Sequence, residues 1–116
     1  MWLDQNKTLL ISLNRDTWQL PVRNNTGDYL GNVVAQIVEP KEYLVRYFLI
    51  YNPNQERRFL LPSDTVTAID EWICCTIGAE YIAQLPDYTQ SLEREDEIRI
   101  YQIISQTPYW ENHLIN

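Results

Sequence analysis

The chain has 116 residues, of which 45% are hydrophobic, a size and composition typical of a single globular domain and not of a disordered chain. Its formal net charge of -7 excludes nucleic acid or an anionic membrane surface as the main partner, because such binding needs clustered Lys and Arg. No apolar run approaches the roughly 20 residues that span a bilayer, so we expect no direct membrane insertion.

The first segment, residues 1–15, is rich in Trp, Leu and Ile but fits neither a period of two nor one of 3.6. We expect an N-terminal arm or a short helix there. Residues 16–23 predict a short strand, in which Pro21 favours an edge or a bend because proline lacks an N–H. Residues 24–28 predict a tight turn, since Gly27 takes a positive φ without strain.

The strand that follows this turn, residues 29–39, has a glycine inside it. Gly31 indicates a β-bulge, a sharp coil or the close approach of another backbone, and each of these helps a small barrel to close. An alternative is that Gly31 only extends the turn. We predict a bulge.

The most strongly apolar segment is residues 43–51, after a turn at residues 40–42. Both faces of this predicted strand are largely apolar, so we expect both to be covered. One face would line a barrel core, and the other would need a helix, the N-terminal arm or a partner molecule.

The second half of the chain predicts further strands and then helices. Residues 57–61 form a short strand that Pro62 ends, and residues 65–77 indicate one strand that continues across a bend. Residues 78–85 indicate a short helix ended by Pro86, and residues 92–105 a longer one with an apolar stripe. We therefore expect a core domain over residues 16–77 and a helical extension over residues 78–116 that packs on it.

The order of these elements, together with four short motifs, resembles the PRC-barrel superfamily. This module forms the cytoplasmic part of the purple-bacterial reaction-centre H subunit and the second domain of a ribosome-maturation factor. The motifs are Gly27-x-x-x-Gly31-x-Val33, Leu61-Pro62, Leu85-Pro86-x-Tyr88 and Pro108-Tyr109-Trp110. The last of them is similar to tails of free-standing bacterial members.

The resemblance implies a mainly β fold, in which a small, strongly bent antiparallel barrel is followed by one or two C-terminal helices. It also implies binding to other proteins, without catalytic or cofactor-binding residues. The chain lacks the membrane helix of the H subunit and the first domain of the maturation factor, so neither a reaction-centre nor a ribosomal role follows. Analogy with the H subunit still leaves open an accessory role in a membrane, photosynthetic complex.

Aromatic residues are the best candidates for an interface, because Tyr and Trp are enriched where proteins bind one another. The candidates are Tyr43, Tyr47, Tyr51 and Trp72. Two explanations stay open: they contact an unknown protein, which could be a second copy of the chain, or the chain's own C-terminal helices cover them.

Other reactive groups have simpler explanations. Cys74 and Cys75 are adjacent, which favours small core fillers in a reducing compartment, and we expect the cytoplasm. His113 has no partner near it in sequence, and the acids at residues 93–97 favour a solvated helix start over a metal site. We expect no metal, cofactor or catalysis. The alternative of a small-molecule-binding or enzymatic barrel would require a pocket where residues such as Val33, Ile37, Phe48, Ile50 and Leu60 are expected to fill the interior.

Overall fold

The fold is mainly β, and a six-stranded mixed sheet is followed by short helices. The computed structural model describes residues 17–39, 41 and 44–112. The strands are β1 (Pro21–Asn24), β2 (Tyr29–Glu39), β3 (Leu44–Asn52), β4 (Arg57–Pro62), β5 (Val66–Ile69) and β6 (Ile73–Cys75). A 3₁₀ turn, η1 (Ser63–Thr65), precedes β5, and the helices are α2 (Ala79–Ile82), α3 (Arg94–Ile103) and α4 (Tyr109–Asn112).

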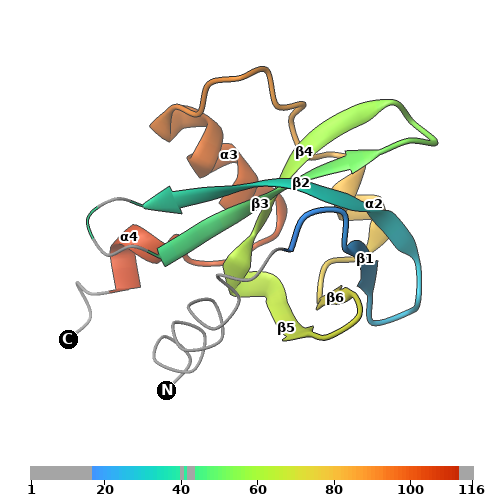
Figure 1. Cartoon of the computed structure of the whole chain (residues 1–116). Coiled ribbons are helices and arrows are strands. Elements are labelled where there is room, and N and C mark those ends of the chain that lie inside the picture. Colours follow the sequence, from blue (N-terminus) through green and yellow to red (C-terminus); the bar gives the residue numbers. More distant parts are fainter. Residues whose placement is uncertain (1–16, 40, 42–43, 113–116) are drawn as a thin grey trace.

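The sheet is strongly bent and does not close. Its strand order is β4-β3-β2-β1-β6-β5. The long strands β2 and β3 cross the molecule, the short strands β1, β6 and β5 curl beneath one end of them, and α3 lies on the opposite side (Figure 1). This confirms the mainly β, bent, PRC-type architecture that the sequence predicts.

The pairing differs from the prediction in two respects. First, β1 and β6 run parallel, so the sheet is mixed and not wholly antiparallel. Second, residues 66–75 form an antiparallel hairpin, in which Ile69 pairs with Ile73, instead of one strand across a bend. The polar residues between them make a tight turn that the Asp70 N–H closes by donating to the Trp72 carbonyl. Because β1 is therefore flanked by β2 and β6, Pro21 is the first residue of an inner strand and does not lie at an edge.

The two glycines of the first hairpin behave as predicted. Gly27 has a φ of +86° in the turn between β1 and β2. Gly31 has a φ of +136°, and the pairing of β1 with β2 passes from Gly31 to Tyr29 without Leu30, which is a β-bulge. A Cβ on Gly31 would lie 2.6 Å from the Tyr51 carbonyl oxygen, so glycine also permits the close approach of β3.

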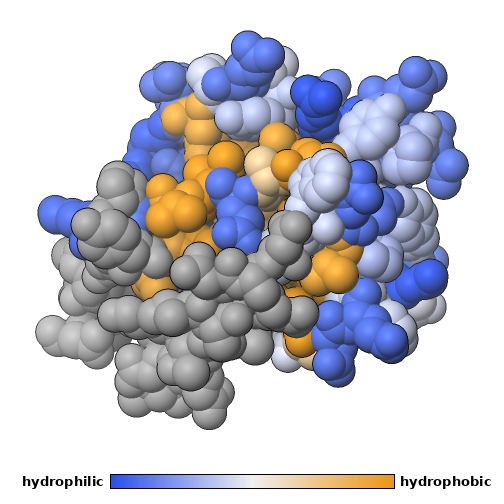
Figure 2. Space-filling view, in the orientation of Figure 1, coloured by the Kyte–Doolittle hydropathy of each residue, from blue (hydrophilic) through white to orange (hydrophobic). Residues whose placement is uncertain are grey.

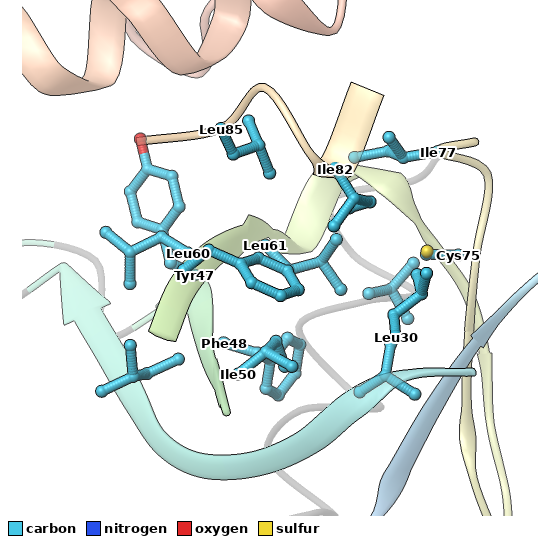
Figure 3. Packing of buried hydrophobic residues seen from close by; sticks show 14 of the residues in the cluster. Leu30, Tyr47, Phe48, Ile50, Leu60, Leu61, Cys75, Ile77, Ile82 and Leu85 are labelled. Carbon is cyan, nitrogen blue, oxygen red and sulfur yellow. The ribbon is translucent and has the colours of Figure 1, made fainter. Parts of the chain in front are cut away.

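The core lies on the concave side of the bent sheet. Among its members, Val33, Phe48 and Ile50 are buried as predicted, whereas Ile37 is only half-buried. Figure 3 shows Ile82 and Leu85 over Leu61, with Phe48 and Ile50 below it, so the segment that contains α2 closes this core. Leu60 is also buried, but strand alternation places it on the opposite face, beneath α3.

The helices differ in length and number from the prediction. Three short helices follow the sheet in the described part of the chain, where one or two were expected. α2 ends at Ile82, before a turn that leads to Pro86. α3 begins with a capping box between Glu93 and Asp96, and Pro108 precedes a further turn of helix, α4. Pro62 is the last residue of β4, as expected of a strand breaker.

Candidate interaction surface

The pairing of the strands brings two of the predicted interface residues onto one face of the sheet. Tyr51 on β3 pairs with Asn32 on β2, and Asn32 pairs with Pro21 on β1. Tyr51 also pairs with Arg58 on β4, and exposed Trp72 directly precedes the residue of β6 that pairs with Val22. We call this row the outer strip; its members are Trp72, Pro21, Asn32, Tyr51 and Arg58.

A second, shorter row lies beside the outer strip. Arg23 on β1 pairs with Tyr29 on β2 and with Cys74 on β6. Arg23 is exposed, whereas the other two are half-buried. The alternate residues of the same strands, such as Val22 and Ile50, are fully buried on the concave face. The strip is therefore the solvent-facing side of a sheet whose other side is core.

Contacts within the strip and with neighbouring residues hold its side chains in place. The Arg58 guanidinium lies 5.9 Å from the centre of the Tyr51 ring, close enough for a cation–π interaction. The Tyr29 hydroxyl donates to the Asn32 side-chain oxygen, and the Asn32 amide donates to the Gln19 carbonyl at 2.8 Å. The strip thus presents aromatic and arginine side chains on a supported surface, and such residues dominate binding energy at interfaces.

The turn at residues 24–28 lies at one end of this surface. Asn24 is buried, and its side-chain oxygen accepts from the N–H groups of Thr26 and Asp28 at 3.1 and 2.9 Å. Hydrogen bonds from Asn24 and Thr26 hold the pKa of the Asp28 carboxyl below its usual range. Arg23 lies at the base of this turn and donates to the Gly27 carbonyl. The turn is therefore rigidly hydrogen-bonded around a buried side chain.

The same face of β3 continues into a region that α3 and α4 cover. Tyr47 is 1% exposed, and its hydroxyl donates to Glu97 of α3 at 2.8 Å. The Tyr109 hydroxyl of α4 donates to the same Glu97 oxygen, also at 2.8 Å. Glu97 is buried, and the Arg94 guanidinium lies 3.7 Å from its other oxygen. Tyr47 therefore cannot contact a partner in this folded state, and the chain's own helices are what cover it.

Aromatic and charged side chains surround the Glu97 carboxylate. The guanidinium of Arg46 lies 4.2 Å from the centre of the Tyr109 ring, and that of Arg94 lies 3.9 Å from the centre of the Trp110 ring. Tyr101 packs edge-on against Trp110, and its hydroxyl donates to Asp64 at 3.0 Å. The motif Pro-Tyr-Trp thus has a structural role, because its rings pack α4 against β3 and α3.

Burial shifts the ionisation of this cluster. It raises the pKa of the Asp64 carboxyl, against the opposing effects of the Tyr101 hydrogen bond and the Arg46 charge. Burial and the hydrogen bond to Glu97 raise the pKa of Tyr109 to about 12. Burial raises the pKa values of Tyr47 and Tyr101 as well, with the Glu97 and Asp64 carboxylates adding to the effect. All three phenols are therefore neutral hydrogen-bond donors near neutral pH.

The remaining candidates differ in what the structure says of them. Cys75 is fully buried, and its burial raises the thiol pKa to about 11, which fits a core filler. Cys74 is a half-buried free thiol whose Sγ lies 3.7 Å from the Asn25 side-chain oxygen. Tyr43 and His113 lie outside the described residues, as does the N-terminal arm.

No group of three or more His, Cys, Asp or Glu side chains that could hold a metal occurs in residues 17–39, 41 and 44–112. A hollow between β4 and the segment that links α2 to α3 has about 30 Å³ of room, enough for one or two water molecules. Its lining includes Leu60, Tyr88 and Ile100. Within these same ranges, no helix has the length and apolar character needed to cross a membrane.

Sequence reasoning missed Glu97, which is the centre of the covered region. Its neighbours Glu93 and Glu95 are exposed, and the acid-rich segment as a whole is typical of a solvated helix start. One signal was available: Glu97 lies three positions before Ile100 and four before Tyr101, so it shares their buried helix face. The adjacent arginines of β4 differ in their surroundings, since Arg57 pairs with Asp87 at 2.9 Å while Arg58 stays exposed.

The bent sheet, the bulge at Gly31 and the buried side chains on its concave side define a small β module. The family model of the PRC-barrel domain matches residues 15–82. The chain therefore belongs to the PRC-barrel family. No curated protein compared with the chain matches it.

Proposed function

We propose that this chain is a non-enzymatic protein-binding module that contacts its partner through the outer strip. The single observation that carries this proposal is the strip itself, in which exposed Trp72 and Arg58 share one row with half-buried Tyr51. Trp, Tyr and Arg are the side chains that most often supply interface binding energy. Tyr47, also a sequence candidate, is left out because it is buried.

The packing of the sheet favours binding over an enzymatic or small-molecule-binding barrel. Phe48, Ile50, Phe59 and Leu61 are 0% exposed and fill the concave side of the sheet, which would be the interior of a ligand-binding barrel. Small-molecule sites are usually clefts of about 300–1,000 Å³, far larger than the water-sized hollow beside β4. A partner macromolecule needs no such cavity.

Self-association is the less favoured form of this proposal. The two apolar faces of residues 43–51 would favour self-association if they were exposed. However, the described part of that run is buried or half-buried against the chain's own elements. We therefore propose a different protein as the partner. Free thiols at Cys74 and Cys75 support a reducing compartment such as the cytoplasm.

The test compares two double variants of the full chain as affinity baits in extracts of the native host. One variant, Arg58→Ser with Trp72→Ser, alters the outer strip. Its matched control, Tyr81→Ser with Arg99→Ser, removes one exposed aromatic residue and one exposed arginine from the helices. We expect the wild type and the control to capture the same protein in equal amounts. The strip variant should capture at least about tenfold less of it.

Two outcomes would contradict the proposal. Equal retention by both variants would place binding elsewhere on the molecule. Retention of the chain only by its own second copy, with sedimentation as a dimer, would replace the partner protein by self-association. Capture of a membrane complex that the strip variant loses would support the proposal and identify the partner as an assembly of the kind that the H-subunit analogy suggests.

A further inference from the structure

Among the described residues, the second half of β2 has no neighbouring strand on one side. β1 pairs with β2 only at Tyr29, Gly31 and Asn32. The residues before β1 extend this pairing by one step, because Val33 exchanges hydrogen bonds with Gln19 and Leu20. Beyond Val33, none of residues 17–39, 41 and 44–112 forms a strand pair with this side of β2, whereas β3 pairs with its other side as far as Glu39.

This unpaired stretch, Val34–Val38, is apolar and partly open to solvent. Val38 is 46% exposed, Val34 and Ile37 are half-buried, and the stretch contains no charged residue. Figure 2, in the orientation of Figure 1, shows apolar residues gathered over the middle of this face, where β2 crosses the molecule. An apolar strand with an unpaired edge is a surface on which another segment can pair or pack.

The described chain begins beside this stretch. The side-chain amide of Gln36 donates to the Thr17 hydroxyl at 2.7 Å, and the Gln19 N–H donates to the Val33 carbonyl at 2.6 Å. Thr17 is 2% exposed, so its position is fixed by packing. Whatever precedes Thr17 must therefore start next to Gln36, in the middle of the unpaired stretch.

We propose that the N-terminal segment, residues 1–16, is the occupant of this surface and that its apolar run Leu9–Leu13 packs on Val34–Val38. The stretch is about 16 Å long at 3.3 Å per residue. Leu13 and Leu9 lie four and eight residues before Thr17, which gives them a reach of up to roughly 14 and 28 Å. The run can therefore cover the whole stretch.

Charge and tethering favour this segment over a second copy of the chain. Residues 1–16 contain two acids, Asp4 and Asp16, and two bases, Lys7 and Arg15, so they carry no net charge. A second copy has a net charge of -7 and would be repelled. A short tether also gives the segment an effective concentration of about millimolar at the surface, well above that of a dilute partner. This inference does not depend on the outer strip.

Hydrogen exchange of the full chain tests the proposal. The variant Leu9→Asp with Leu13→Asp changes two residues that share a face in either a helix or a strand, because they are four apart. Its control, Asn6→Asp with Asn14→Asp, adds the same charge at polar positions of the same segment. We expect those amides of Val34–Val38 that do not donate to β3 to exchange about tenfold faster in the leucine variant and to be unchanged in the control.

The amides of Phe48–Ile50, in the core of β3, report whether the fold is intact. If the double variant loosens them, Leu13→Asp with Asn14→Asp as its control repeats the test with a smaller change. Equal exchange of Val34–Val38 in both variants would overturn the proposal, as would unprotected amides in the wild type. Protection that rises with protein concentration, together with sedimentation as a dimer, would also overturn it by making a second copy the occupant.

Discussion

One face of β3 is covered by helices at one end and partly exposed at the other. At Tyr47 the face is closed by α3 and α4, whose residues Glu97 and Tyr109 join the Tyr47 hydroxyl in one hydrogen-bonded cluster. At Tyr51, four residues or about 13 Å further along the strand, the face is partly open, and the half-buried Tyr51 forms part of the outer strip. The two tyrosines are equivalent in the sequence pattern. What distinguishes them is the reach of helices that lie some 50 residues away, which bury Tyr47 and leave Tyr51 half-buried.

The largest loss of stability should follow from a substitution of Gly31, which lies against Tyr51 at the open end of the face. Gly31→Ala would place a Cβ 2.6 Å from the Tyr51 carbonyl oxygen at a φ of +136°. Backbone strain of this kind costs of order 1–3 kcal/mol, and the clash adds to it, so we expect a loss of about 3 kcal/mol in the free energy of unfolding. Denaturant titration measures it.

Gly27→Ala is the control for this change. Gly27 also has a positive φ, but a Cβ there would have nothing within 4 Å, so only the conformational penalty of about 1–2 kcal/mol remains. Equal losses for the two variants would show that Gly31 is needed for its φ alone and that the approach of β3 is not tight.

A somewhat smaller loss should follow from a change at the covered end. Glu97→Ala leaves the buried hydroxyl of Tyr47 without its acceptor, and hydrogen bonds to charged groups contribute about 1.5–3 kcal/mol each. We expect a loss of about 2–3 kcal/mol by denaturant titration. Glu95→Ala removes an exposed acid from the same turn of α3 and should change stability by less than about 0.5 kcal/mol. A Glu97→Ala protein as stable as Glu95→Ala would contradict the role given to Glu97.

The covered end should also open at high pH. The pKa of Tyr109 is raised from its ordinary value of 10 to about 12, and those of Tyr47 and Tyr101 are raised in the same direction. The unfolded chain therefore loses these protons first. Stability from the phenols is complete below about pH 10 and falls as the pH rises through 12.

Unfolding free energies measured between pH 8 and about pH 12 would show this fall. Tyr109→Phe removes one of the three titrating phenols, so its stability should decline less steeply than that of the wild type. A variant that declines as steeply would mean that Tyr109 titrates normally and is not held in the cluster.

The smallest effect on stability is expected in the outer strip. Trp72 is 44% exposed and lies outside the core, so Trp72→Ser should change the free energy of unfolding by at most about 0.5 kcal/mol. Thermal unfolding of this variant beside the wild type measures the change. A loss as large as that of Glu97→Ala would show that Trp72 is a structural residue and would weaken its assignment to an interface.

Local features of the chain were predictable from sequence, and distant pairings were not. The turn at Gly27 and the bulge at Gly31 follow from the conformational freedom of glycine, which is a property of single positions. The parallel pairing of β1 with β6 joins residues about 50 positions apart, and no local pattern encodes it. The reversal between Ile69 and Ile73 was hidden because three polar or aromatic residues fit a bend as well as a turn.

The candidate surface was predicted only in part for the same reason. Tyr51 and Trp72 were selected by residue type, but their place in one row depends on the register of β3, β2, β1 and β6. Tyr47 was selected by the same criterion and is buried, because a tyrosine that donates to a buried carboxylate looks the same in sequence as one that faces solvent. Residue type finds candidates, and the fold decides among them.

Hydroxyl-radical footprinting of the full chain, followed by mass spectrometry, tests the division of this face most directly. We expect Trp72 and Tyr51 to be oxidised and Tyr47 to be protected. In Glu97→Ala, oxidation of Tyr47 should rise while that of Tyr51 stays the same. Oxidation of Tyr47 in the wild type to the same extent as Tyr51 would contradict the account, because it would mean that α3 and α4 do not close the face.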